Sequence, residues 1–251
     1  MREKRILLVP RDFKVLDFIG RFGWCNEKHL IQLLDMPIDK KSYQIIQNRV
    51  LKRLVEAKYL MRTKLQINEP AIITIAENGA EYLNCKKTNV KRCFLEHDML
   101  VIDLYFSLLK NLEDDGEVET DRETRRDLGY CDLNERKMRI PDLLIRDQAI
   151  EVEISEKNKD RLKKILNQYI FNDSVKKVNY FVRDKNLAHK IHDLSKYNEK
   201  FDVYIFKDDI TNFIKFDRSQ QNLNQKYTSK PVGKIQEEDL EKYRKKEVKG
   251  M

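Results

Sequence analysis

The chain has 251 residues, of which 41% are hydrophobic and 37% are charged, and its net charge is +8. This apolar content can form a core and excludes wholesale disorder, and no apolar run approaches the ~18 residues of a membrane-spanning helix. The apolar run Ile6–Val9, behind a basic N-terminus, ends at Pro10 and is too short for a secretory signal, which needs ~7–15 residues. We therefore expect a cytoplasmic protein with no membrane partner.

The cysteines form no closely spaced pair; they are Cys25, Cys85, Cys93 and Cys131. Scattered cysteines are typical of reduced thiols in the cytoplasm, and a structural zinc site needs ligands in close pairs. The sequence therefore favours neither disulfides nor structural zinc.

The net positive charge is concentrated in the first third of the chain. Residues 1–90 contain 17 Lys and Arg against 10 Asp and Glu, whereas residues 91–251 contain 33 against 32. A basic module joined to a nearly neutral one indicates a polyanionic partner such as nucleic acid, although a lysine-rich surface can also serve solubility alone.

Three helices and a hairpin are expected in the first module. Pro10 begins a helix that Gly23 closes, Asn26 caps a second, and a third runs over Lys40–Ala57 with apolar residues at intervals of three and four. The later elements are strands at Met61–Ile67 and Ala71–Ile75 and a helix at Glu77–Leu83. This order predicts a winged helix-turn-helix domain over residues 1–88.

A helix of this kind fits the major groove of DNA, where amide and cationic side chains reach base edges and phosphates. We expect the DNA-contacting residues on the polar face of the third helix and in the wing: Lys40, Lys41, Ser42, Gln44, Gln47, Asn48, Lys52, Arg53, Arg62 and Lys64. The alternative is a protein–protein module whose charged face is simply solvated.

The second part, residues 89–218, alternates between helical and strand patterns, and a polar, charged tail follows over 219–251. The expected helices are Phe94–Leu108, Asn158–Phe171 and Asn186–Tyr197. The expected strands are Glu117–Glu123, Arg139–Arg146, Ala149–Ser155, Lys177–Val182 and, as the last, Phe201–Phe206, with a charged loop over 125–137.

Three acidic residues lie on the central strands of this part. Glu151 and Glu153 are two apart on one strand and therefore share a face, and Asp142 on the preceding strand can join them. Carboxylates gathered in this way repel one another unless a cation neutralises them, and Mg²⁺ or Mn²⁺ suits such ligands. The alternative is that both glutamates belong to the solvated face of an edge strand.

The order of elements, with Pro141-Asp142 and Glu151-Val152-Glu153, resembles the PD-(D/E)XK restriction-endonuclease-like fold. That resemblance implies a mixed-sheet α/β nuclease domain with Asp142, Glu151 and Glu153 as metal ligands. Glu153 stands where the family usually has Lys, and Lys157 is a candidate substitute. Glu96 and His97, on the first helix of this part, are further candidate catalytic residues.

Taken together, the winged helix with Arg53-Leu54-Val55, then His97, Asp142, Glu151 and Tyr169, resembles the replication-relaxation family of plasmids and mobile elements. The resemblance implies binding of double-stranded origin DNA, with relaxosome or replication proteins or a second copy of the chain as partners. It also implies metal-dependent DNA nicking in replication, relaxation or mobilisation. The alternatives are an inactive DNA-binding accessory protein or repressor, which uses the second domain for dimerisation or docking, and a scaffold without a DNA role.

Overall fold

The computed structural model describes residues 6–64, 70–110, 118–127, 139–195 and 198–216. The chain is of the mixed α and β class and forms two compact units. Unit 1 comprises residues 1–103 with 120–130, and unit 2 comprises residues 104–119 with 131–251. The division falls within a helix, α6, rather than at the expected boundary after residue 88. The predicted tail over 219–251 lies outside the described residues.

Unit 1 begins with two helices whose ends follow from their sequence signals. Helix α1 (Pro10–Phe22) has proline at its first position and ends at Gly23, whose φ of 86° is the left-handed conformation that glycine tolerates. Helix α2 (Glu27–Leu33) is capped by Asn26, whose side-chain oxygen accepts from the His29 N–H at 3.0 Å. The two-residue strand β1 (Trp24–Cys25), which the sequence analysis did not predict, lies between them.

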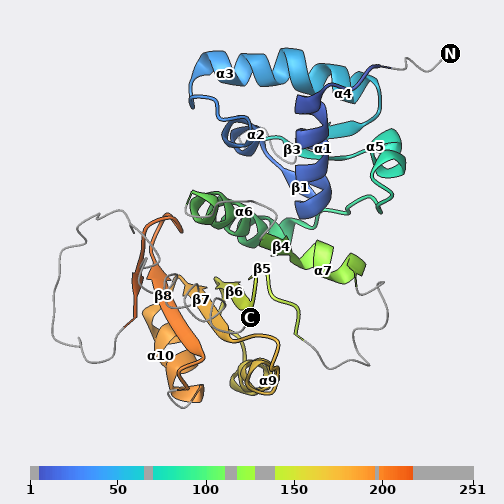
Figure 1. Cartoon of the computed structure of the whole chain (residues 1–251). Helices are drawn as coiled ribbons and strands as arrows, with labels where there is room; N and C mark the ends of the chain where they lie inside the picture. The colour runs from blue at the N-terminus through green and yellow to red at the C-terminus, as the bar shows by residue number, and fades with distance from the viewer. Residues whose placement is uncertain (1–5, 65–69, 111–117, 128–138, 196–197, 217–251) are drawn as a thin grey trace, which may run out of the picture. The chain divides into compact units, whose positions relative to one another are not determined.

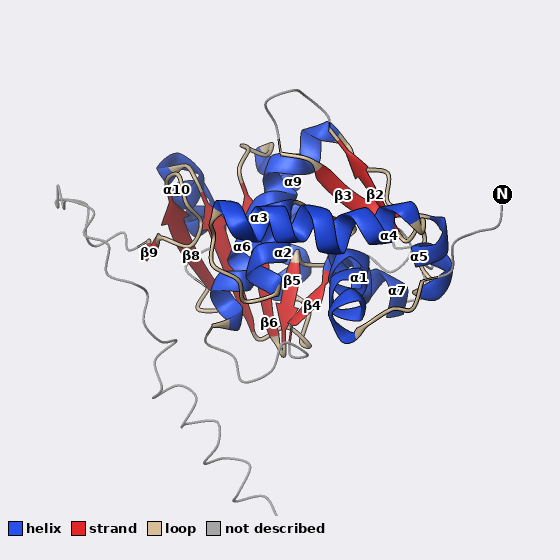
Figure 2. Cartoon of the chain, turned by 90° about the horizontal axis from the view of Figure 1, so that it is seen from above, coloured by secondary structure: helices blue, strands red, loops and turns tan. Residues whose placement is uncertain are grey.

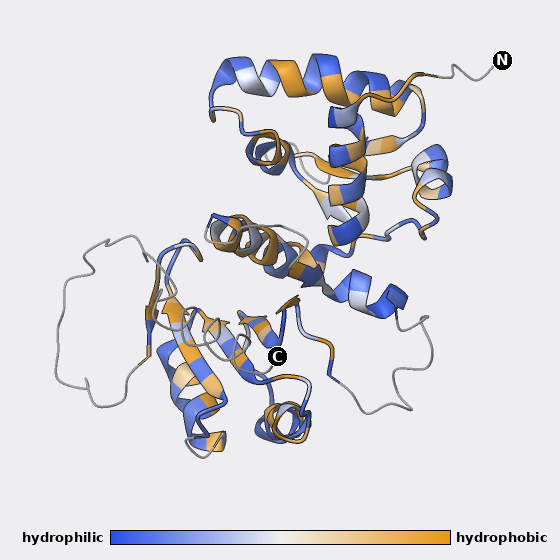
Figure 3. Ribbon diagram, in the orientation of Figure 1, coloured by the Kyte–Doolittle hydropathy of each residue, from blue (hydrophilic) through white to orange (hydrophobic). Residues whose placement is uncertain are grey.

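The third helix is continuous over residues 40–56 but changes its hydrogen-bonding pattern in the middle (Figure 2). It consists of α3 (Lys40–Ile45), a π-helical segment η1 (Ile46–Leu51) and α4 (Lys52–Glu56). Ile46, Val50 and Leu54 are fully buried, and they repeat every four residues, so one side of the helix faces the core. Figure 3 shows this mixture of hydrophobic and hydrophilic positions along the helix.

A three-stranded antiparallel sheet completes unit 1, with strand order β1-β3-β2. Strand β2 (Leu60–Thr63) pairs with β3 (Ile72–Ile75), and β3 is buried along its whole length. Both strands are shorter than predicted, and residues 65–69, which the prediction divided between strand and turn, lie outside the described residues. Helix α5 (Glu77–Tyr82) follows β3, as the sequence predicts.

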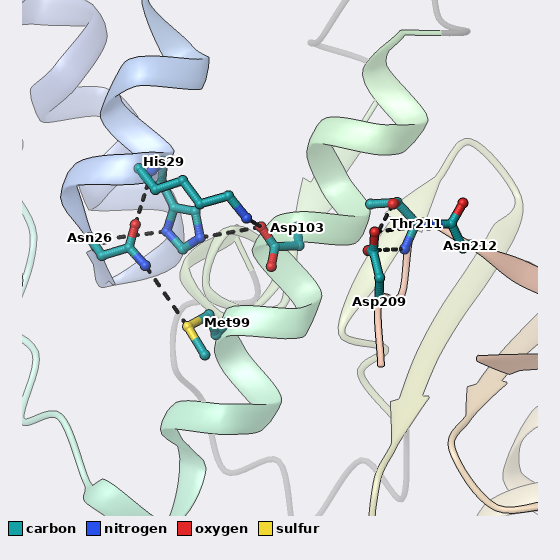
Figure 4. Close-up of polar contacts among 8 residues, drawn as sticks. Asn26, His29, Met99, Asp103, Asp209, Thr211 and Asn212 are labelled. Carbon is teal, nitrogen blue, oxygen red and sulfur yellow. Dashed lines mark hydrogen bonds and ion pairs between the residues drawn. The ribbon is translucent and has the colours of Figure 1, made fainter. Parts of the chain in front are cut away.

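A short 3-10 turn (Arg92–Phe94) leads into helix α6 (Leu95–Leu109), whose first half belongs to unit 1. The predicted helix began at Phe94, but the α-helix begins one residue later, and Phe94 is 54% exposed. Polar contacts join α2 to α6: His29 Nε2 lies 3.6 Å from Asp103 Oδ1, and the Asn26 amide is 3.8 Å from the Met99 sulfur (Figure 4).

The structure replaces the predicted strand Glu117–Glu123 with a shorter strand β4 (Val118–Thr120) followed by helix α7 (Asp121–Asp127). Thr120 and Glu123 form a capping box at the start of α7, because the Glu123 N–H donates to Thr120 Oγ1 and the Thr120 N–H donates to Glu123 Oε2. These bonds end the strand. Helix α7 also occupies 125–127 of the predicted charged loop, and the remaining residues of that loop, 128–137, lie outside the described part.

Unit 2 contains a six-stranded mixed sheet of order β4-β5-β6-β7-β8-β9. Strands β5 (Leu143–Ile145) and β6 (Gln148–Glu153) form an antiparallel hairpin, and β6, β7 (Lys177–Val182) and β8 (Phe201–Phe206) run parallel. An antiparallel strand, β9 (Phe213–Lys215), follows β8. Strand β8 is therefore not the last, and the strand predicted at 139–146 is shortened to Leu143–Ile145.

Helices α9 (Lys159–Ile170) and α10 (Lys185–Leu194) cover one face of this sheet (Figure 1). Alternate residues of β7, Val178, Tyr180 and Val182, enter the hydrophobic core together with Leu166 and Ile191 of the two helices. Ala149 of β6 joins the same core, so the acidic residues two and four positions further along β6 lie on the helix-covered face.

Candidate functional site

The outer side of the helix over residues 40–56 carries exposed polar residues in a row. Their spacing along the helix is close to four, so they lie on one face, about 18 Å long at 1.5 Å per residue. The members of this basic face are Lys40, Lys41, Gln44, Asn48 and Lys52. Two amides therefore lie between lysines at both ends, in a unit that holds most of the net positive charge of the chain.

Ser42 is not part of this face. Its exposed fraction is 3%, because it lies one helical turn before the buried Ile46 and shares its side of the helix. The prediction that Ser42 contacts DNA is therefore wrong. Lys64, at the end of the hairpin strand, is exposed as expected.

Gln47 and Arg62 are held by one carboxylate of the chain itself. Glu27 is almost fully buried and accepts from Gln47 Nε2 at 2.8 Å and from Arg62 Nε and a terminal nitrogen at 3.0 and 2.6 Å. This carboxylate of α2 thus ties the third helix to strand β2. The geometry gives both residues a structural role.

Arg53 is also engaged internally. Its guanidinium forms an ion pair with Asp12, which is fully buried in α1, and donates to the Leu7 carbonyl at 3.2 Å. A buried carboxylate needs such a partner, because desolvation without compensation is strongly unfavourable. Arg53 therefore joins α4 to α1.

In unit 2 the acidic cluster, Asp142, Glu151 and Glu153, is centred on Glu151 of β6. The Arg139 guanidinium donates to both oxygens of Glu151, at 2.8 Å from Nε and 2.7 Å from a terminal nitrogen. The hydroxyl of Tyr169, a buried residue of α9, donates to the same carboxylate. Burial raises the pKa of Glu151, and the charge of Asp142 adds to this effect, while Arg139 and Tyr169 oppose it.

Asp142 lies directly before β5, and its Oδ2 accepts the backbone N–H of Val152 at 2.8 Å. Tyr180 of β7 is the register partner of Glu151, and its buried hydroxyl has no hydrogen-bond partner among the described residues. Burial raises the pKa of Tyr180, and the charge of Glu151 contributes to the increase. The structure thus gathers Asp142, Glu151 and two tyrosines on one face of the sheet.

Glu153 lies on the same face of β6 and forms an ion pair with Lys157, while the Ser155 hydroxyl donates to it at 3.3 Å. Burial lowers the pKa of Lys157, and the charge of Glu151 opposes this effect. This ion pair places Lys157, the candidate substitute for the usual lysine, beside the acidic cluster.

A divalent ion does not fit this arrangement. Glu151 Oε1 accepts two hydrogen bonds and Oε2 accepts one, which leaves little of the roughly four-lone-pair capacity of a carboxylate. Glu153 is paired with Lys157. Within the described ranges, no group of three or more His, Cys, Asp or Glu side chains could hold a metal ion. The Mg²⁺ or Mn²⁺ site over Asp142, Glu151 and Glu153 stays a prediction that this geometry does not support.

Glu96 and His97 lie in the first turn of α6, within unit 1. Glu96 is exposed, and His97 Nδ1 lies 3.1 Å from the carboxylate of its neighbour Asp98. Their predicted catalytic role rests on the sequence alone.

Arg139, Glu27 and Asp12 pair with predicted site residues but were not themselves predicted. An arginine two positions before the Pro141-Asp142 pair was the available signal, but a one-dimensional pattern does not show which carboxylate it faces.

No protein-family model, curated protein or solved structure matches the chain. In the part of the chain that the structure describes, no helix has the length and apolar character needed to cross a membrane.

Proposed function

We propose that the chain is a DNA-binding protein whose basic face enters the major groove of double-stranded DNA. The observation that carries this proposal is the row of Lys40, Gln44, Asn48 and Lys52, all exposed and on one side of a helix. Glutamine and asparagine can form two hydrogen bonds with adenine, and lysines at both ends suit the flanking phosphates.

The order of elements supports a winged helix-turn-helix assignment for unit 1, with β2 and β3 as the wing hairpin. For unit 2, the order α6, β4, β5, β6, α9, β7 supports the restriction-endonuclease-like assignment. Together with Asp142, Glu151 and Glu153, this order also supports placing the chain near the replication-relaxation family, with origin DNA as the ligand and a plasmid or mobile element as the setting.

The geometry of unit 2 favours the accessory or repressor role over nicking, because each glutamate of the acidic cluster is neutralised by a cation of the same chain. Metal-dependent nicking is the second candidate. Two observations favour it: Asp142 is close to Glu151, and Lys157 lies beside the acidic cluster. In the accessory role, unit 2 serves dimerisation or docking to replication or relaxosome proteins.

The test of DNA binding is fluorescence anisotropy with a labelled duplex of random sequence, measured across a range of salt concentrations. Phosphate contacts predict that log K falls linearly with log salt, by about 0.9 for each contact. A Lys40→Ala/Lys41→Ala/Lys52→Ala variant should bind more weakly and reduce the slope by about one per lysine that contacts phosphate.

The matched control is Lys159→Ala/Lys163→Ala/Lys164→Ala, which removes three exposed lysines from α9 of unit 2. The proposal fails if this control reduces binding as much as the first variant does, or if binding does not depend on salt. Selection of sequences from a random duplex pool, followed by Gln44→Ala and Asn48→Ala, then identifies the base positions that each amide reads.

A further inference from the structure

We infer that Arg139 acts as a built-in cation of unit 2, taking the place that a divalent ion would hold at Glu151, so that the wild-type acidic cluster is metal-independent. This inference concerns the chain's own residues and holds whether or not unit 1 binds DNA.

The first step is the burial of Glu151. Its side chain is 3% exposed and lies on the face of β6 that α9 covers, beside a hydrophobic core. An ionised carboxylate in such a place requires a charged partner with good geometry. The planar guanidinium of Arg139 supplies it, since two N–H groups meet the two oxygens in parallel.

The second step is the distribution of charge around Glu151. Asp142 adds a second negative charge close enough to affect the ionisation of Glu151, and Glu153 adds a third on the same face of β6. Arg139 and Lys157 add two positive charges. These two side chains together bring the same positive charge that a divalent ion would bring.

The third step is the competition for oxygen atoms. Mg²⁺ needs near-ideal octahedral geometry at about 2.0–2.1 Å from its ligands, so it requires open lone pairs directed at one point. The bonds from Arg139 and Tyr169 already occupy three such positions on Glu151. An ion could enter only if Arg139 left, and Asp142 and Glu151 would then repel each other without a cation between them.

Removal of the guanidinium should therefore create an ion site. We would compare the full-length wild type with Arg139→Met, which keeps much of the apolar volume, and count bound Mn²⁺ by electron paramagnetic resonance. Arg139→Met should bind one Mn²⁺ more than the wild type, and the added Glu151→Gln change should abolish that site. Lys163→Met, which removes an exposed cation of α9, is the matched control and should gain no site.

Thermal melting gives a second readout. Mn²⁺ at tenfold its Kd should raise the Tm of Arg139→Met by about 3 °C, while the Tm of the wild type stays unchanged. Arg139→Met that folds but gains no Mn²⁺ site would overturn the inference.

Should Arg139→Met fail to fold, the wild type and Glu151→Gln decide the question. Equal Mn²⁺ stoichiometry for these two proteins supports the inference, because the intact cluster then holds no ion. A wild type that binds one Mn²⁺ more than Glu151→Gln overturns it.

Discussion

His29 is a fully buried histidine at the contact between α2 and α6, where Asp103 and Lys28 face it. Burial lowers the pKa of His29 from its ordinary value of 6.5, although the charge of Asp103 opposes this effect. The folded state then binds a proton less readily than the unfolded state, so the contribution of His29 to stability is present above pH 6.5 and is lost as the pH falls through the folded pKa.

We predict that the free energy of unfolding decreases as the pH is lowered below 6.5, and that His29→Gln flattens this dependence. Chemical denaturation of both proteins at a series of pH values between about 8 and 5 measures this pH dependence. An unchanged pH profile in His29→Gln would assign the effect to another group.

Arg53 and Lys52 are neighbours in sequence with different environments, since Arg53 pairs with the buried Asp12 and Lys52 is exposed. We predict that Arg53→Met destabilises the protein by about 2 kcal/mol, because it removes the closer of the two guanidinium groups beside the buried Asp12 and leaves only Arg11, at 3.7 Å. Lys52→Met should change stability by less than about 0.5 kcal/mol.

The effects of the two variants on DNA binding should be the reverse of their effects on stability. The salt dependence of binding is measured under conditions where both variants are folded. Lys52→Met should reduce the slope by about one, and Arg53→Met should leave it unchanged. A reduced slope in Arg53→Met would mean that Arg53 leaves Asp12 to contact phosphate.

At the scale of elements, helix α5 lies close to the turn that precedes β2, and a glycine makes this approach possible. A Cβ added at Gly79 would lie 2.3 Å from the Tyr59 carbonyl oxygen and 3.2 Å from Ile75 Cγ2. That carbonyl accepts the Ala76 N–H at 2.9 Å, so it cannot move without loss of a backbone hydrogen bond.

Gly79→Ala should therefore destabilise the protein by about 1–3 kcal/mol, the usual effect of overpacking, as measured by urea denaturation. Gly20→Ala in α1 is the control, because its Cβ would meet only the flexible end of the Leu83 side chain, at 2.9 Å. Its effect should stay within about 1 kcal/mol, since alanine also favours the helix. Equal effects of the two changes would contradict this account of α5.

At the scale of the whole molecule, the charge and the acidic cluster point to separate roles. Residues 1–90 have 17 basic and 10 acidic residues, which suits a DNA-binding module, whereas the carboxylates of β6 are neutralised within unit 2. We therefore predict that the full-length protein leaves supercoiled plasmid intact in millimolar Mg²⁺ or Mn²⁺, as read on an agarose gel. Nicking that Asp142→Ala abolishes would establish the second candidate function instead.

Local sequence signals predicted many elements closely. Strands β7 and β8 have the expected bounds. Gly23 ends helix α1 and Asn26 caps the start of helix α2, both as predicted. The short strands β1 and β9 were missed, because two or three residues carry no readable periodicity. Helix α7 was missed although Thr120 and Glu123 have the spacing of a capping box.

The sequence by itself determined the mixed class of the chain, its basic first third and the shared face of Glu151 and Glu153, because composition and side-chain period are local properties. Only the tertiary structure decided which charged side chains pair within the protein and which remain available to a ligand. Arg53, Arg62 and Arg139 each face a buried carboxylate from a distant or neighbouring element, and those pairings depend on how the helices and strands pack. Desolvation makes such partners obligatory once the fold has buried the acid, so the three arginines serve the interior of the protein.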